Sequence, residues 1–276
     1  MLAQYYKDDK FDVTTGNYIA QPKLNGLRAW LVNLQVSIGE GTLFQETKRM
    51  NLFISRGTGE LYYLPHITDH LTIPPDVWFD GEIYKHGVPL NIINSSTPRL
   101  HLASGNVTNV SNSEILEYHC YDIGKRGINF NDREKERYII KHDQIKVVEN
   151  LPIIGTNPDA LLRDMIDRGY EGVMFRDLYS NYFFGHRVSC LLKYKEKQTG
   201  VFVLADINKN EKGEIVGVFI NDLNDSEFEA TFKVPKETAN NYFDNKEMYK
   251  GRIVQVTYIE RSGVANVPFH GNAEKI

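Results

Sequence analysis

Residues 21–28, QPKLNGLR, place Lys23 and Arg28 on either side of an Asn-Gly pair. An Asn-Gly pair between apolar residues is a strong signal for a hairpin turn, and in that interpretation Lys23 is a solvated lysine at a strand end. The amine of a lysine can instead act as a covalent nucleophile if its pKa falls from about 10.4 toward neutrality. Because a K-x-[DN]-G-x-R pattern occurs by chance in roughly one chain of this size in a few hundred, other residues must distinguish the two roles.

Five more segments follow in chain order and carry residues of the types that can bind phosphates, metal ions or aromatic rings. Carboxylates suit Mg²⁺, and strand residues two positions apart face the same side. Each residue also has a plainer interpretation: a core tyrosine, solvated or turn carboxylates beside a glycine, and exposed strand lysines. The segments are FISRGTGE with Arg56, FDGEIY with Glu82, YHCYD with Tyr121, EGVMFR with Glu171, and LLKYK with Lys193 and Lys195.

The 276-residue chain has a formal net charge of −4 and the composition of an ordinary globular protein. The charge excludes a uniformly basic coat for nucleic acid but not a local basic groove. Cys120 and Cys190 have no CxxC spacing, which argues against a zinc site and favours a reducing cytoplasm. No apolar run is long enough to cross a membrane, and residues 1–13 lack a signal-peptide pattern. We therefore expect a cytoplasmic protein without a membrane segment.

Short strands with turns are predicted for most of residues 17–122, and helices follow. The charged segment 131–146 is predicted to be a helix with Asp132 as its N-cap. A second helix is predicted within 157–170, with Pro158 near its start and Gly169 as its C-cap. β-branched and aromatic residues predict strands at 17–24, 27–34, 77–87, 115–124, 172–177 and 190–196.

The chain changes character near residue 199, and we place a domain boundary there. Four strand-like runs follow, with a short helix predicted at 236–243 before the last of them. Four or five strands in so short a segment predict a small barrel of the OB-fold type. The expected domains are therefore residues 1–198 and 199–276. The four runs are 201–207, 214–221, 228–234 and 252–260.

Taken in order, the motifs resemble those of the covalent nucleotidyltransferase superfamily, which contains ATP-dependent DNA ligases, RNA ligases and mRNA capping enzymes. The segments PKLNGLR, DGEIY, EGVMFR and LLKYK are most similar to the small DNA ligases of phages and viruses. The resemblance covers about residues 20–200, and the expected barrel follows where the family has one. It implies an α+β fold, in which a nucleotidyltransferase (ATP-grasp-like ligase) domain of antiparallel sheets with helices precedes a C-terminal OB-fold β-barrel.

The resemblance also implies a mechanism. Lys23 would be the catalytic residue and would attack the α-phosphate of ATP, which donates AMP. Glu82 and Glu171 would hold Mg²⁺ or Mn²⁺, since hard cations prefer oxygen ligands. Lys193 and Lys195 would neutralise the charge that develops on the α-phosphate.

Other motif residues would hold the nucleotide. Tyr121 would stack on adenine, and Gln21 would contact its exocyclic edge through side chain or backbone. Arg28 and Arg56 would bind ribose and phosphates, with Arg56 also a candidate for the 5′-phosphate of a nick. Arg187 lies where related ligases carry an arginine. The implied nucleotide-binding set is Gln21, Asn25, Arg28, Arg56, Glu82, Tyr121, Arg187, Lys193 and Lys195.

Two positions depart from the family pattern. Asn25 stands where most DNA ligases have aspartate, and some RNA ligases carry asparagine there. In the tail, ERSGVANVPFHGNAEKI, Asn266 occupies the expected place of an arginine that reaches the outer phosphates of ATP. Arg261 and Lys275 are candidates to replace it. Both departures bear on the first step, the transfer of AMP to Lys23.

We therefore predict an ATP-dependent DNA ligase that acts as a monomer and seals 3′-hydroxyl/5′-phosphate nicks in duplex DNA through a lysyl-AMP intermediate. Asn25 favours one alternative, an RNA ligase of the same superfamily. The altered tail motivates another, a catalytically weakened ligase-like protein that binds nicks. A capping guanylyltransferase, which uses GTP, is a further alternative.

Overall fold

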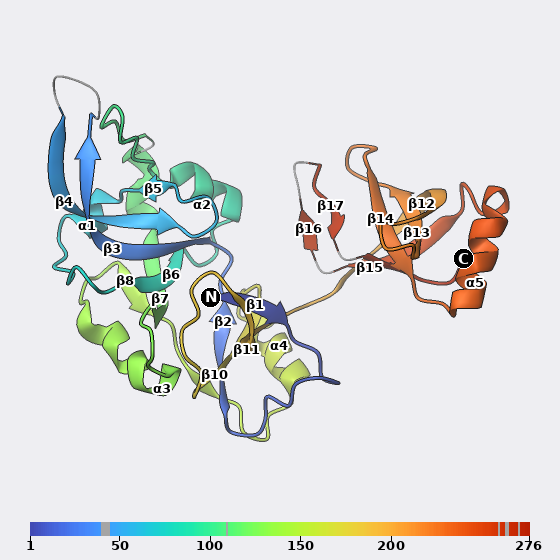
Figure 1. Cartoon of the computed structure of the whole chain (residues 1–276), viewed down its shortest axis with the longest axis horizontal. Coiled ribbons are helices and arrows are strands. Elements are labelled where there is room, and N and C mark those ends of the chain that lie inside the picture. The colour runs from blue at the N-terminus through green and yellow to red at the C-terminus, as the bar shows by residue number, and fades with distance from the viewer. Residues whose placement is uncertain (40–44, 109, 259, 263–264, 270) are drawn as a thin grey trace. The chain divides into compact units, whose positions relative to one another are not determined.

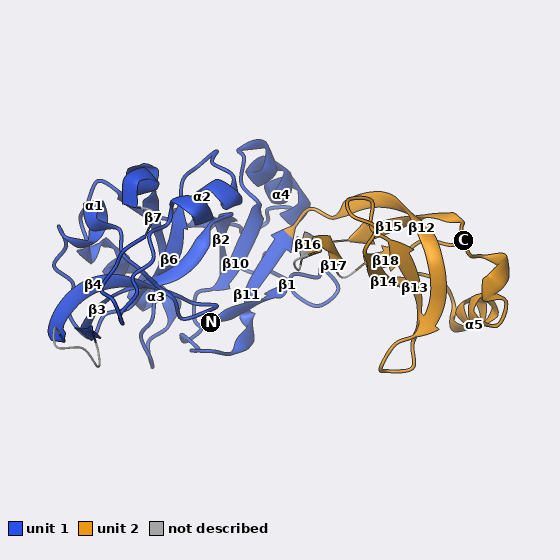
Figure 2. Ribbon diagram, turned by 90° about the horizontal axis from the view of Figure 1, so that it is seen from above, with its two compact units in different colours: residues 1–194 blue, residues 195–276 orange. Residues whose placement is uncertain are grey.

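The computed structural model describes residues 1–39, 45–108, 110–258, 260–262, 265–269 and 271–276 (Figure 1). The chain divides into two compact units, residues 1–194 and 195–276 (Figure 2). Among the described residues, no helix is long and apolar enough to span a bilayer. Each unit has its own apolar core and is described separately below.

The first unit contains a six-stranded and a five-stranded sheet. The six-stranded sheet has the order β5-β4-β3-β6-β7-β8 and the five-stranded sheet the order β1-β11-β10-β2-β9. The larger sheet consists of β3 (Leu27–Ile38), β4 (Glu46–Ser55), β5 (Leu61–Tyr62), β6 (Phe79–Tyr84), β7 (Glu117–Ile123) and β8 (Ile145–Val147). The smaller consists of β1 (Leu2–Tyr5), β2 (Tyr18–Lys23), β9 (Leu151–Pro152), β10 (Gly172–Asp177) and β11 (Arg187–Lys195).

The Asn-Gly pair joins the two sheets and does not close a hairpin. β2 pairs with β10 and β9, whereas β3 pairs with β4 and β6. The hairpin interpretation of this pair is therefore wrong, because its two flanking strands never bond to each other. Gly26 is required by space, since a Cβ there would lie 2.4 Å from the carbonyl oxygen of Ile83. The connection is thus a tight crossing between sheets.

Short helices complete the first unit, and one prediction among them is wrong. Residues 131–146 do not form one helix. α3 (Phe130–Arg133) gives way to the 3₁₀ segment η2 (Glu134–Ile139), and the N-cap of α3 is Asn129 rather than Asp132. Charge predicted a solvated helix here, but Arg133 and Arg137 are buried and donate to buried acceptors. The remaining helices are α1 (Pro65–Thr68), α2 (Leu90–Ser96), η1 (Val110–Ile115) and α4 (Pro158–Asp167).

The prediction of the second helix is confirmed. α4 begins at Pro158, and the side chain of Asn157 caps it by accepting from two backbone N–H groups. The C-cap is Arg168 rather than Gly169, which follows it with a φ of +83°, the left-handed conformation that glycine adopts just after a helix ends. Met165 of α4 packs in a small core beside the five-stranded sheet.

The second unit is a closed five-stranded barrel, as expected for an OB-fold. Its strands follow the order β12-β13-β14-β18-β15, and Phe202, Phe219 and Phe232 fill its core. A two-stranded hairpin of β16 (Glu260–Ser262) and β17 (Val267–Phe269) accompanies it. The barrel consists of β12 (Gln198–Lys209), β13 (Ile215–Ile220), β14 (Glu227–Phe232), β15 (Ile253–Tyr258) and β18 (Gly271–Ala273), with helix α5 (Lys236–Asp244) and the 3₁₀ turn η3 (Lys246–Met248).

Candidate active site

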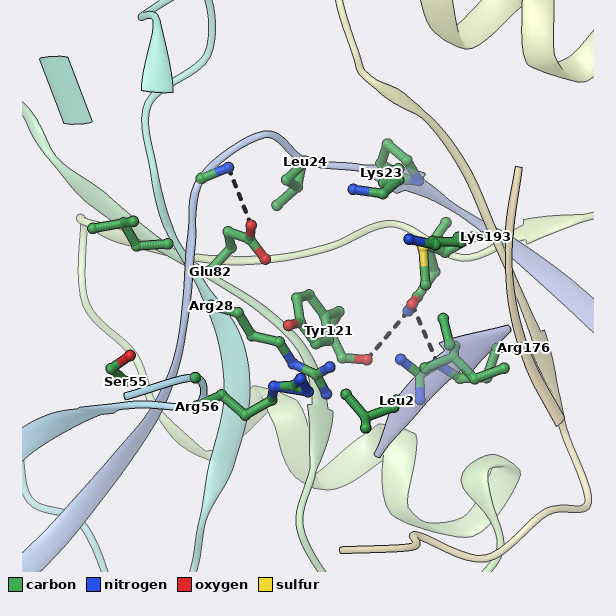
Figure 3. A pocket seen from close by; sticks show the side chains of 18 of the residues that line it. Leu2, Lys23, Leu24, Arg28, Ser55, Arg56, Glu82, Tyr121, Arg176 and Lys193 are labelled. Carbon is green, nitrogen blue, oxygen red and sulfur yellow. Dashed lines mark hydrogen bonds between the residues drawn. The ribbon is translucent and has the colours of Figure 1, made fainter. Parts of the chain in front are cut away.

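A cavity of about 450 Å³ in the first unit brings most of the sequence-predicted site residues together (Figure 3). Asn25, Glu171 and Lys195 are not among the residues that line it, although Glu171 lies beside it. Asn25 is exposed in the crossing turn, and Lys195 is the last residue of β11. The predicted residues that do line it are Gln21, Lys23, Arg28, Arg56, Glu82, Tyr121, Arg187 and Lys193.

Lys23 lies at the end of β2, where its register partner is Gly172 of β10. Its Nζ forms an ion pair with Oε2 of Glu171, and the Glu171 N–H donates to the Lys23 carbonyl at 3.0 Å. The two side chains are 18% and 23% exposed, so the pair is reachable from the cavity but largely shielded from water. The backbone pairing therefore fixes the amine and its carboxylate partner side by side.

Glu82 supplies a second carboxylate near Lys23. Its Oε1 accepts a hydrogen bond from the Gly26 N–H at 3.1 Å, so it also holds the crossing turn. Burial raises the pKa of Glu82 to about 7, although Lys23 and Arg28 act in the opposite direction and Glu171 adds to the increase. Near neutral pH this carboxyl group is therefore close to half protonated.

The carboxylates of Glu82 and Glu171 form a donor set that suits a hard divalent cation. No group of three or more histidine, cysteine or acidic side chains within the described ranges is placed to hold a metal ion. Mg²⁺, however, usually keeps several waters and takes only one or two protein carboxylates. Burial is the main cause of the raised pKa of Glu82, and the charges of Lys23 and Arg28 do not fully offset it.

Arg28 is fixed by a buried partner that sequence reasoning missed. Its Nε and Nη2 donate to Asp80 at 3.0 and 2.5 Å, and its Nη1 donates to the Met1 carbonyl at 2.7 Å. Asp80 is only 1% exposed and also accepts from the Tyr182 hydroxyl at 2.6 Å. The Asp80 side chain thus fixes the orientation of Arg28 in the cavity. The signal for it in the sequence was its place in the DGEIY segment.

Tyr121 and Gln21 form one side of the cavity. The Tyr121 ring lies 5.6 Å from the Arg28 guanidinium carbon, and burial raises its pKa, which keeps the phenol neutral. Gln21 is 2% exposed; its amide nitrogen donates to the Tyr121 carbonyl at 3.2 Å and to Asn150 at 2.8 Å. Its amide oxygen accepts from Arg176 at 3.3 Å. Both amide hydrogens of the Gln21 side chain are therefore used within the protein.

The remaining cations differ in how they are held. Arg56 lies directly after β4, and its guanidinium has no hydrogen bond or ion pair with a described residue. Arg187 donates to the Ala3 carbonyl, and Lys193 lies over the Tyr5 ring at 4.0 Å from its centroid. Arg56 is therefore the cavity cation best suited to accept an anionic group from solvent.

A buried ionic cluster behind Gln21 was also missed. Asp122, which is fully buried, forms ion pairs with Arg133 and Arg176. Arg176 reaches the cavity, so the cluster links the core to the cavity wall. An arginine at the end of the apolar strand EGVMFR was the available signal, since an arginine in a buried strand requires a partner.

The tail of the second unit places the two candidate substitutes for the expected arginine differently. Arg261 donates to Asn221 at 2.8 Å and to Asp222 at 2.7 Å, so its charge is already paired within the unit. Lys275 is exposed near the end of the chain. Asn266 has a φ of +50°, a turn conformation that asparagine tolerates.

Comparison with known proteins agrees with this architecture. No protein-family model and no curated protein matches the chain. A Lig E DNA ligase, described as binding DNA with a minimal scaffold, is 15% identical with a TM-score of 0.60, over 99% of this chain and 96% of that one. Pmar-Lig_PreS3 is 15% identical with a TM-score of 0.63, over 99% and 65%. A mycobacterial DNA ligase D complexed with ATP is 14% identical with a TM-score of 0.50, over 99% and 92%.

These likenesses show that the chain has the fold of DNA ligases, in which a unit of two sheets precedes a five-stranded barrel. The expected α+β fold class is confirmed. The motif residues from the sequence gather, for the most part, around one cavity of the first unit.

Proposed function

We propose that this protein is an ATP-dependent polynucleotide ligase that seals nicks in duplex DNA. The observation that carries the proposal is the placement of Lys23 at the cavity, with Glu82 and Glu171 beside it and Tyr121 and Arg56 on the walls. A nucleophilic amine, two carboxylates, an aromatic face and an anion-binding cation are the groups that nucleotidyl transfer to lysine needs. The DNA ligase fold supports the same activity.

In the first step, Lys23 attacks the α-phosphate of ATP, forms a phosphoramidate bond to AMP and releases pyrophosphate. The amine must first lose its proton, and the adjacent carboxylate of Glu171 is placed to accept it. Lys193 and Arg28 offset negative charge on the phosphates, and the Tyr121 ring packs against the base. Mg²⁺ bound by Glu82 and Glu171 would offset further charge on the phosphates.

In the later steps, the AMP moves from Lys23 to the 5′-phosphate of the nick, and the 3′-hydroxyl then attacks that phosphate and expels AMP. Arg56 is the residue we assign to the 5′-phosphate, because no described residue pairs with its guanidinium. We further propose that the protein works as a monomer in the cytoplasm.

Labelling with α-³²P-ATP and Mg²⁺ tests the first step. Wild type should form an acid-labile protein-AMP adduct, and Lys23→Ala should form none. Lys48→Ala, which removes an exposed lysine of β4, serves as the matched control and should label like wild type. A wild-type protein that neither labels nor seals a pre-adenylylated nick would refute the proposal.

An RNA ligase is the second candidate, because Asn25 replaces the usual aspartate and lies exposed beside the nucleophile. Nicked duplexes with DNA or RNA on the 3′-hydroxyl side separate the two activities. Faster sealing with RNA ends would favour the RNA ligase. GTP in place of ATP as the labelling substrate would indicate a guanylyltransferase.

A weakened, nick-binding protein is the third candidate, because Asn266 lacks the expected charge and Arg261 is paired with Asp222. The double variant Asn25→Asp/Asn266→Arg tests it. A rise in labelling from none to a high rate would favour loss of activity in the natural chain. Similar labelling by wild type and variant would favour a working ligase.

A further inference from the structure

Tyr182 lies in the loop between β10 and β11 of the five-stranded sheet, yet its hydroxyl group reaches the six-stranded sheet. The side chain is buried, with 3% exposed. Its oxygen lies 3.2 Å from the indole nitrogen of Trp30 and 2.6 Å from Oδ2 of Asp80, and the Met1 nitrogen lies 3.5 Å away. Trp30 and Asp80 are register partners on β3 and β6. A loop of one sheet therefore contacts two paired strands of the other.

The direction of these hydrogen bonds follows from the groups that form them. An indole N–H can only donate, so the Tyr182 oxygen accepts from Trp30. An ionised carboxylate can only accept, so the single hydrogen of the Tyr182 hydroxyl goes to Asp80. Burial raises the pKa of Tyr182, and the charge of Asp80 adds to the increase, so the phenol keeps this hydrogen. The hydroxyl group is thus fixed as a donor to the carboxylate.

The carboxylate that Tyr182 contacts also holds Arg28. Asp80 accepts from Nε and Nη2 of Arg28 at 3.0 and 2.5 Å, and the Met1 carbonyl accepts from Nη1 at 2.7 Å. A guanidinium carries more N–H groups than these three bonds use, and the others have no hydrogen-bond acceptor among the described residues. Arg28 lines the cavity beside Tyr121 (Figure 3). Its remaining N–H groups are therefore available to an acceptor in the cavity.

We propose that Tyr182 is a positioning residue, which fixes Asp80 so that Arg28 presents its remaining N–H groups to the nucleotide. The inference rests on the proposed function, because it requires Arg28 to bind ATP. Tyr182 does not line the cavity, so its effect passes through the ion pair. Its loop continues from β10, the strand that pairs with β2 and Lys23. The contact thus aligns an arginine of one sheet with the nucleophile of the other.

The test is the dissociation constant of α,β-methylene-ATP, an analogue that cannot transfer AMP, measured by titration calorimetry with Mg²⁺. Tyr182→Phe removes the hydroxyl group and keeps the ring, which packs on Phe184 at a centroid distance of 4.7 Å. The dissociation constant should rise about five-fold, the effect of having to order one long side chain on binding. This readout involves no chemical step, so it reports the position of Arg28 alone.

Tyr118→Phe is the matched control, because it removes another buried hydroxyl group between the same two strands. The Tyr118 hydroxyl lies 3.0 Å from the carbonyl oxygen of Ala29 and 2.7 Å from that of Phe79, so it donates to the backbone and not to a carboxylate. The variant should lower the melting temperature, because a buried hydrogen bond is lost. Its dissociation constant should stay within about two-fold of wild type.

A second background tests whether the effect passes through the ion pair. Arg28→Leu/Asp80→Leu removes both charges, a replacement that buried ion pairs often tolerate. In this background Tyr182→Phe should leave the dissociation constant unchanged, because no arginine remains to be positioned. The same rise there as in the natural chain, or an equal rise in Tyr118→Phe, would overturn the inference and assign Tyr182 a purely structural role.

The positioning role and the ligase proposal fail differently. If wild type labels with ATP and Tyr182→Phe binds the analogue as tightly as wild type, the positioning role is wrong and the ligase proposal stands. If wild type neither labels nor seals a pre-adenylylated nick, both are wrong.

Discussion

Replacing Glu82 by glutamine tests whether the cavity holds an unfavourable negative charge. Burial raises the pKa of this carboxyl group from 4.5 to about 7. A carboxyl group with a higher pKa in the folded state binds its proton more tightly there. The free energy of unfolding therefore falls as pH rises from about 4.5 to about 7, and the loss is complete above that range. At 1.36 kcal/mol per pKa unit, the loss is about 3 kcal/mol.

Glutamine removes this titration and keeps an oxygen that accepts from the Gly26 N–H. At pH 5 the Glu82→Gln variant should match wild type in unfolding free energy within about 1 kcal/mol. At pH 8.5 it should be more stable by about 3 kcal/mol, because only wild type then buries a charge. The two should therefore diverge as the pH rises through the interval between the two pKa values.

Urea unfolding followed by tryptophan fluorescence measures this, because both tryptophans, Trp30 and Trp78, lie in the first unit. Glu114→Gln, at an exposed carboxylate of the same unit, controls for the general effect of removing a negative charge. Glu82→Gln and wild-type curves that stay parallel from pH 5 to 8.5 would show that Glu82 does not lose stability on ionising. The same pH dependence in Glu114→Gln would assign the effect to the loss of any negative charge.

Two further substitutions test the packing around the cavity. Asp80→Asn leaves Arg28 without its anion and should lower the unfolding free energy by about 3 kcal/mol. This is the smaller end of the range for buried ion pairs, because the Arg28 side chain is 22% exposed. A loss below about 1 kcal/mol in urea unfolding would contradict this expectation. Gly26→Ala puts a methyl group 2.4 Å from the Ile83 carbonyl oxygen and should cost about 2 kcal/mol or more. It should also weaken Lys23 labelling, and an unchanged melting temperature would argue against the steric requirement.

Local patterns predicted most of the strands and the helix α4, because alternation and capping are properties of neighbouring residues. The predicted helix at 131–146 was wrong for the opposite reason. Charge usually marks a solvated face, but Arg133 is drawn inward by Asp122, which is eleven positions away in the chain. Nothing in the local sequence of a charged segment reports such a partner.

In the candidate site, too, sequence motifs predicted some residues, whereas contacts between distant segments were missed. Lys23 and Glu82 were chosen by motif order, and the fold brings them to one cavity. Asp80 and Tyr182 were not foreseen as a pair with Arg28, because their contact depends on how β6 and the loop before β11 meet in space. Strand parity placed Lys195 with Lys193, yet Lys195 ends its strand and does not line the cavity.

The crossing turn at Asn25-Gly26 has a mechanical consequence. Glu171 directly precedes β10 in the sheet that carries Lys23, whereas Glu82 belongs to β6 of the other sheet. A divalent cation held by both carboxylates would link the two sheets, in addition to the chain itself, which passes between them at residues 24–26 and again at residues 148–150. Removal of such a cation should speed amide exchange where the two sheets meet more than within either sheet.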